Sequence, residues 1–194
     1  MCKENEEFLK YHNYLLKRSL FGDFYRKYIL FPKLKSKLGN NFIDVGCGLG
    51  EILFYGDIEK CIGLDINPYN IKFAANKGLN VKCINPSEKF PLEDNSTSSV
   101  LCDQVLEHVK SPDHLLSEIH RILRFGGQVL FGVPCEKGFM RDEDHIIFYD
   151  LNKLKLLCKK YNFLYKKSFY FPIPSKRIGK LLGYQSLYAT FESI

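Results

Sequence analysis

Three glycines in close succession separate a β-prone run from an apolar segment in the first third of the chain. The run Phe42–Gly46 is typical of a short strand, and Glu51–Tyr55 can begin a helix. Gly46, Gly48 and Gly50 have no Cβ atom, so the backbone between them can turn tightly and approach a ligand closely. The sequence therefore predicts a strand, a turn and a helix with a ligand-binding loop. A plain tight turn is the alternative.

The alternation of strands and helices continues along the chain. Near-continuous apolar runs predict further strands at 61–65, 81–84, 100–102, 127–133, 163–171 and 186–191. Helices are predicted at 6–38, with a restart at Pro32, and at 68–77, 112–123 and 151–161, and a polar loop at 135–145. Apolar strands separated by helices indicate a parallel sheet covered on both faces. The predicted fold is α/β and Rossmann-like, with seven mostly parallel strands and an antiparallel C-terminal edge strand.

A chain of 194 residues suits one domain. We expect residues 1–194 to form it, with a helical segment or lid at 1–39, a ligand-binding core at 40–134, and a loop, a helix and two strands at 135–194. The aromatic residues of the first segment are expected to lie mostly in the core. They are Tyr11, Tyr14, Phe21, Phe24, Tyr25 and Tyr28.

Composition limits the partners and the compartment. The net charge of +6 reflects 28 basic and 22 acidic residues without a nucleic-acid-binding motif, so no nucleic acid is expected. Seven cysteines without a C-x-x-C pair argue against disulfides and structural zinc, and favour a reducing, cytoplasmic location. No signal peptide and no transmembrane segment is predicted. Residues 175–182 are basic and amphipathic, which fits a solvated helix better than peripheral membrane contact. The oligomeric state stays open.

Two aspartates indicate the charge of the ligand. Asp44 lies at the end of the first predicted strand, where its carboxylate would repel a pyrophosphate but would suit an ammonium group. Asp65 ends the second strand, where an acid can accept both ribose hydroxyl hydrogens. An aspartate that caps the following helix is the alternative. S-adenosyl-L-methionine is a ribonucleoside with an amine and a sulfonium, and it is the predicted cofactor.

Four ordered stretches carry a resemblance to a known family. They are FIDVGCGLGE at 42–51, CIGLDINP at 61–68, FPLEDNSTSSVLCDQVLEHV at 90–109 and LLSEIHRILRFGGQVLFGVP at 115–134. With them the chain resembles the class I S-adenosylmethionine-dependent methyltransferases, in particular methyltransferase type 11, over residues 40–165. The resemblance implies a transferase that methylates an O-, N- or C-nucleophile on a small or medium-sized acceptor, such as a sugar, lipid or quinone intermediate.

The resemblance also implies a set of cofactor-binding residues. Those around the methionyl group would be Asp44, Gly46, Cys47, Gly48 and Gly50, with Asp65 on the ribose, Ile66 against adenine, and Asp103, Gln104 and Val105 beside the sulfonium. The chain departs from the family in two places. Pro86 stands where an aspartate usually reads the adenine amine, so Asn85 or Ser87 is expected to substitute. Thr97-Ser98 replaces the usual Phe-Asp.

Two histidines are candidate catalytic residues. His108 follows the fourth strand, at the sheet edge where open α/β sheets bind ligands. It is either a general base or a histidine that hydrogen-bonds its loop. His145 follows three acidic residues in the loop after the fifth strand, which lines the acceptor pocket in related sequences, and it is either catalytic or part of an exposed polar loop. No metal site is predicted.

Two other functions remain open. One is a non-catalytic module that binds S-adenosylmethionine, which the Pro86 substitution makes worth testing. The other is an NAD(P)-dependent oxidoreductase, because glycine loops in this position also bind dinucleotides. Asp44 and the lack of an evident hydride-transfer site argue against the oxidoreductase.

Overall fold

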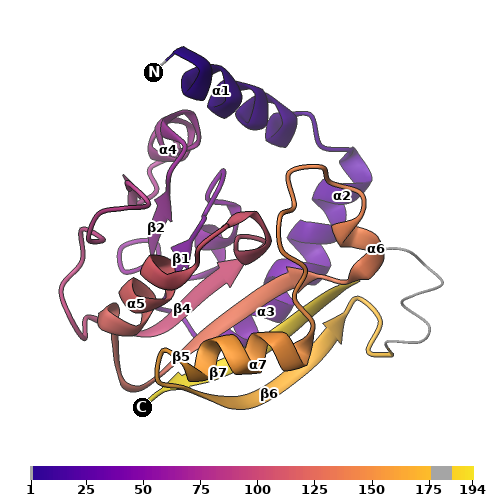
Figure 1. The fold of residues 1–194 in the computed structure, drawn as a ribbon. Coiled ribbons are helices and arrows are strands. Elements are labelled where there is room, and N and C mark those ends of the chain that lie inside the picture. The colour runs from indigo at the N-terminus through magenta and orange to yellow at the C-terminus, as the bar shows by residue number, and fades with distance from the viewer. Residues whose placement is uncertain (1, 176–184) are drawn as a thin grey trace. The chain divides into compact units, whose positions relative to one another are not determined.

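The computed structural model in Figure 1 describes residues 2–175 and 185–194, which form two compact units, Met1–Pro91 and Leu92–Ile194. Seven strands occur in the described residues, in the order β3-β2-β1-β4-β5-β7-β6. The Rossmann-like fold class predicted from the strand and helix pattern is confirmed. The single domain predicted over residues 1–194, with its three parts, stays a prediction.

The first unit contains a three-stranded parallel sheet. Its strands are β1 (Ile43–Val45), β2 (Ile62–Asp65) and β3 (Val81–Cys83). Its helices are α1 (Cys2–Leu16), α2 (Leu20–Tyr25), the π-helix η1 (Arg26–Leu30), α3 (Phe31–Leu38), the 3₁₀-helix η2 (Glu51–Tyr55) and α4 (Pro68–Ala75). Val45 pairs with Leu64, and Asp65 with Cys83, so the carboxyl ends of the three strands lie at one edge.

Local signals explain where the elements around β2 begin and end. Asn67 caps α4, because its side-chain oxygen accepts the backbone N–H groups of Tyr69 and Asn70. Gly78 follows that helix with φ +79°, a conformation that favours glycine. The helix predicted after the glycine loop is only the single 3₁₀ segment η2.

The helices before β1 correct one expectation. Pro32 lies in the first turn of α3, as the predicted restart requires. The aromatic side chains of these helices are mostly exposed, however, and the expectation that they lie in the core was wrong. The exposed ones are Tyr11 (40%), Tyr14 (64%), Phe21 (80%), Phe24 (56%) and Tyr28 (58%). The aliphatic residues Leu15, Leu30 and Leu34 occupy the buried positions instead.

The second unit contains a four-stranded mixed sheet. Its strands are β4 (Thr97–Asp103), β5 (Leu123–Pro134), β6 (Phe163–Phe171) and β7 (Ser186–Ser193). Its helices are the 3₁₀-helix η3 (Leu106–His108), α5 (Asp113–Ile122), α6 (Glu136–Phe139) and α7 (Leu151–Lys159). Strands β4 and β5 are parallel, and β7 runs antiparallel to both β5 and β6. The antiparallel strand is therefore internal, and β6 lies at the edge.

Apolar faces of α5 and α7 help to form the core of this unit. Leu116, Ile119 and Ile122 of α5 are fully buried, as are Leu154 and Cys158 of α7. Figure 1 shows α7 in front of the β6–β7 pair. The loop predicted at 135–145 contains α6, a single helical turn that the polar composition did not indicate. The predicted basic segment at 175–182 lies outside the described residues apart from its first member.

No helix in the described part of the chain is long and apolar enough to cross a membrane.

Candidate functional site

The glycine loop after β1 is closely tied to the end of β2. The backbone N–H groups of Gly46 and Cys47 both donate to the carbonyl oxygen of Leu64, at 2.7 and 3.0 Å. Gly46, Gly48 and Gly50 have φ angles of 80°, 54° and 72°, in the left-handed region that favours glycine. At Gly50 a Cβ atom would also lie 2.7 Å from Leu79 Cδ1. The glycines are therefore required by the path of the loop itself.

Most backbone N–H groups of the loop donate within the protein. Besides the two bonds to Leu64, the N–H of Gly48 donates to Asp65 Oδ2 at 2.7 Å, and that of Gly50 donates to the carbonyl of Cys47 at 2.9 Å. A loop that binds a pyrophosphate instead points such N–H groups at the phosphate oxygens. The following helix is a short 3₁₀ segment and offers little dipole. This geometry argues against a dinucleotide site.

Asp65 is buried, 8% exposed, at the carboxyl end of β2. Its Oδ2 accepts the Gly48 N–H, and its Oδ1 accepts the Asn67 N–H at 2.8 Å. Burial raises the pKa of this carboxyl above its usual value. The alternative that Asp65 caps the following helix was wrong, because Asn67 is the cap of α4 and Asp65 only accepts the Asn67 N–H. The Asn70 side chain also interacts with this carboxyl and lowers its pKa against the effect of burial. A carboxylate has about four lone-pair positions, so at most two remain for hydroxyl donors.

Asp44 and Asp65 both lie close to Cys47 of the glycine loop. Asp44, within β1, is 4% exposed, and Cys47 is 8% exposed. Burial raises the pKa of the Cys47 thiol, and the nearby carboxylates of Asp44 and Asp65 raise it further. Two buried acids on adjacent strand ends form a locally negative environment, which favours a cationic group. The structure thus brings together Asp44, the glycine loop and Asp65.

The remaining predicted residues of the first unit are exposed. Ile66, directly after β2, is 44% exposed, which leaves an apolar side chain available to a flat ring. Asn85, after β3, folds its own turn: its Oδ1 accepts the Ser87 N–H at 3.0 Å, and its Nδ2 donates to Glu88 at 2.9 Å. The carboxyl ends of β2 and β3 share one edge, which places Ile66 and Asn85 on the same side of the sheet.

Asp103, Gln104 and Val105 follow one another at the end of β4 in the second unit. Gln104 has φ +56°, unusual for a residue other than glycine, and its backbone N–H donates to Gly132 at 2.9 Å. The Asp103 carboxylate lies over Gly132, where a Cβ atom would be 2.1 Å from its Oδ1. The missing Cβ atom of Gly132 leaves room for this carboxylate, and Gln104 Nε2 and the Tyr188 hydroxyl each donate to it at 3.4 Å.

Glu107 is the residue that the sequence analysis did not select. It lies in η3 with 0% exposure, and neither carboxylate oxygen has a hydrogen-bond partner among the described residues. Burial raises its pKa to about 8, and the charges of Asp103 and Asp142 contribute. The signal that could have identified it is its position in Val105–Val109, where Glu107 and His108 are the only polar residues among three apolar ones.

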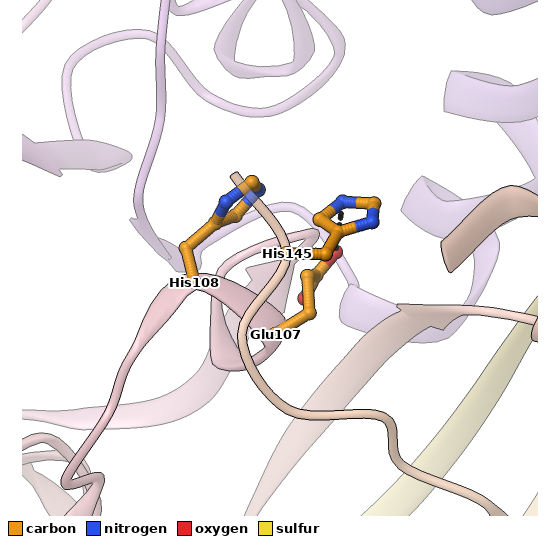
Figure 2. Close-up of side chains that lie close together, drawn as sticks. All are labelled: Glu107, His108 and His145. Carbon is orange, nitrogen blue, oxygen red and sulfur yellow. Dashed lines mark ion pairs between the residues drawn. The ribbon is translucent and has the colours of Figure 1, made fainter. Parts of the chain in front are cut away.

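The two candidate histidines meet at Glu107. Figure 2 shows His108 from η3 and His145 from the loop after α6 on either side of this carboxylate. Their ring centroids are 4.8 Å apart, and His145 Nε2 lies 4.0 Å from Glu107 Oε1. The side chain of His145 is only 8% exposed, although Arg141, Glu143 and Asp144 of the same loop are exposed. Its ring stacks on Phe139 of α6.

Each histidine ring also contacts a backbone carbonyl. His108 Nδ1 lies 3.1 Å from the Asp144 oxygen, and His145 Nδ1 lies 2.8 Å from the Phe139 oxygen. Burial lowers the pKa of His108. The contact with the Asp144 backbone opposes this shift, and the neighbouring His145 adds to it. His108 is therefore a neutral imidazole near pH 7. Its Nδ1 contacts the backbone carbonyl of Asp144, and its Nε2 lone pair can still accept a proton.

A separate cavity of about 510 Å³ lies against α7. It is lined by residues of α7 and of the 146–149 segment, and it contains none of the predicted site residues.

Part of the chain matches a known protein family. Residues 43–131 match the model of the methyltransferase domain family. A thiol S-methyltransferase of Homo sapiens is 34% identical over 119 residues, which are 55% of this chain and 49% of that protein. The chain spans 34%, 46% and 49% of the lengths of the first three curated relatives that it matches.

Solved structures share the fold. A possible histamine N-methyltransferase of Thermotoga maritima has a TM-score of 0.70 at 17% identity, over 95% of this chain and 98% of that one. A methyltransferase solved in complex with the Trm112 activator of Haloferax volcanii has a TM-score of 0.72 at 17% identity, over 89% and 92%. Over residues 43–131 the chain is therefore similar to the methyltransferase domain family, and it shares its fold with solved S-adenosylmethionine-dependent methyltransferases.

Proposed function

We propose that this chain transfers the methyl group of S-adenosyl-L-methionine to a small or medium-sized acceptor. The observation that carries the proposal is the pairing of two buried carboxylates, Asp44 and Asp65, with a glycine loop whose N–H groups mostly donate within the protein. Such a site offers acceptors and negative charge, whereas a diphosphate needs donors and positive charge. The alternative of an NAD(P)-dependent oxidoreductase is therefore less well supported.

Each predicted residue has a role that its position allows. Beside its contacts with Gly48, Asn67 and Asn70, Asp65 keeps at least one lone-pair position for a ribose hydroxyl, and Asp44 supplies negative charge for the methionyl ammonium. Ile66 offers an apolar surface to the adenine ring, and the Asn85–Ser87 turn offers polar groups beside it. Asp103, Gln104 and Val105 are proposed to lie beside the methionyl and sulfonium groups. The cofactor, when bound, supplies a methyl carbon already activated by positive sulfur.

The acceptor side needs orientation more than acid–base chemistry. In-line displacement at an activated methyl group is accelerated mainly by alignment of the nucleophile. A base is required only when the nucleophile carries a proton with a high pKa, such as a hydroxyl or an ammonium. His108, which is neutral near pH 7, can accept such a proton at Nε2. This role of His108 and that of His145 stay predictions, as does the cytoplasmic location.

Calorimetry with three ligands tests the cofactor assignment. We expect S-adenosylmethionine and S-adenosylhomocysteine to bind with comparable affinity and NAD to show no heat of binding. Binding of NAD without a response to the other two would overturn the proposal. Transfer of a labelled methyl group to a panel of thiols, phenols and amines then distinguishes an enzyme from a non-catalytic binding module, because only the enzyme labels an acceptor.

A further inference from the structure

A cluster of three metal-ligating side chains lies entirely within the second unit. Glu107, His108 and His145 each offer one ligand atom, and these atoms all lie within 4.8 Å of one another. Figure 2 shows both rings and the carboxylate turned toward a common space. We call this set the Glu–His–His cluster.

The carboxylate of the cluster lacks the partners that its burial demands. Glu107 has 0% exposure, and neither oxygen is hydrogen-bonded within the described residues. His145 Nε2 is 4.0 Å away, too far for a hydrogen bond. Burial of a carboxylate without hydrogen-bond donors destabilises the folded state, and proteins compensate for it with a paired charge or a metal ion. The arrangement therefore has space for a cation between the carboxylate and the rings.

Both rings present a lone pair to this space. A backbone carbonyl only accepts hydrogen bonds, so the Nδ1 atoms of His108 and His145, which face carbonyls at 3.1 and 2.8 Å, carry their ring hydrogens. The Nε2 atoms are then unprotonated and can bind a cation. Metal-bound histidines are held in this way, with the second ring N–H donating to a carbonyl or carboxylate.

The distances require only a small closure. In a tetrahedral site with bonds of about 2.1 Å, neighbouring ligand atoms are about 3.4 Å apart. The ligand atoms of the cluster are at most 4.8 Å apart, so side-chain movements of about an ångström are enough. Asp142 adds a carboxylate 3.9 Å from His145 Nε2 and increases the negative charge around the cluster.

We propose that Glu107, His108 and His145 bind a divalent transition-metal ion, with Zn²⁺ as the best fit, and leave at least one coordination position open. Two imidazole nitrogens and one carboxylate suit Zn²⁺ and Co²⁺, whereas Mg²⁺ and Ca²⁺ prefer sites made of oxygen atoms. In the loaded protein neither Nε2 atom is free to accept a proton, so both histidines are ligands rather than bases. The open position is available to water or to an oxygen, nitrogen or sulfur atom of an acceptor.

The experiment measures metal binding without cofactor or acceptor, so its result is independent of the proposed methyl transfer. The chain is treated with a chelator, dialysed, and titrated with Zn²⁺, Mg²⁺ and Ca²⁺ by calorimetry. Co²⁺ is added separately, and its visible absorption bands report the ligands. Because Cys83 is an exposed free thiol that would itself bind these metals, the titrations use a Cys83→Ser background.

We expect one Zn²⁺ per chain, at least 100-fold weaker binding of Mg²⁺ and Ca²⁺, and Co²⁺ bands that a chelator removes. Glu107→Gln and His145→Gln should each weaken Zn²⁺ binding at least tenfold. His120→Gln is the matched control, because His120 lies in α5 against Phe163, outside the cluster, and should leave the affinity unchanged.

Two results would overturn the proposal. One is unchanged Zn²⁺ affinity in both cluster variants with native circular dichroism. The other is a background protein that shows no Co²⁺ bands or binds Mg²⁺ as tightly as Zn²⁺, and this readout stands even if a cluster variant fails to fold.

Discussion

Asp65 and Glu107 are both buried carboxylates at or just after the carboxyl end of a strand, but their surroundings differ. Each oxygen of Asp65 accepts a backbone N–H, whereas neither oxygen of Glu107 has a hydrogen-bond partner in the described residues. Asp65 is therefore part of the scaffold that holds the glycine loop and keeps lone pairs to spare. Glu107 is desolvated without compensation, which is a property of functional sites more than of structural ones.

The largest expected effect concerns Glu107 in the metal-free protein. Its folded pKa of about 8 lies above the usual 4.5, so the folded state holds a proton that the unfolded state has lost between these values. Stability should therefore fall as the pH rises from about 4.5 to 8 and level off above it. The loss is roughly 3 to 5 kcal/mol. Glu107→Gln removes this dependence. Urea denaturation in the presence of a chelator at pH 5, 7 and 9 measures the unfolding free energy of the native chain and of Glu107→Gln. The same pH dependence in both proteins would contradict the prediction.

A pair of glycine substitutions tests how tightly the first unit is built. Gly50 and Gly78 both have positive φ, but a Cβ atom at Gly50 would be 2.7 Å from Leu79, whereas at Gly78 nothing lies within 4 Å. We expect Gly50→Ala to cost about 2 to 3 kcal/mol of unfolding free energy and Gly78→Ala about 1. Urea denaturation gives both values. Equal losses would mean that the loop tolerates displacement.

Asp65→Ala should weaken binding of S-adenosylhomocysteine by about 1 to 3 kcal/mol, because ribose hydroxyls would lose a charged acceptor. Asp65→Asn keeps one acceptor oxygen and should lose less. The exposed Glu59 provides the control, since Glu59→Ala removes a surface carboxylate of the same unit. Calorimetry measures the dissociation constants. An unchanged constant in Asp65→Ala would leave this carboxylate with a structural role alone.

The smallest expected effect is at the cap of α4. Asn67→Ala removes the acceptor for the Tyr69 N–H and should lower the unfolding free energy by about 1 kcal/mol. Asn67→Asp keeps the capping oxygen but loses the Nδ2 donor to the Phe8 carbonyl, so it should restore only part of the stability. Thermal denaturation compares the two, and similar melting temperatures would show that other contacts hold this helix end.

The strand and helix pattern was sufficient to predict the fold, because apolar periodicity and glycine positions are local properties. The glycine loop and Asp65 were accessible for the same reason. The Glu–His–His cluster could not be predicted in this way, since His145 lies in a loop far along the chain from Glu107 and no local pattern shows that the two meet. The burial of the N-terminal aromatic residues was predicted wrongly, because helical spacing shows which residues share a face but not whether another element covers that face.

The antiparallel strand β7 has a consequence for synthesis. It pairs with β5 on one side and with β6 on the other. Both of these strands are synthesised before residues 186–193, so during translation they lack the strand that pairs with them. Until then β5 and β6 each present an unpaired edge, which is a template for aggregation. Nascent chains stalled before residue 186 should therefore be protease-sensitive across the whole second unit and bind chaperones, whereas release of the last strand should protect the unit in one step.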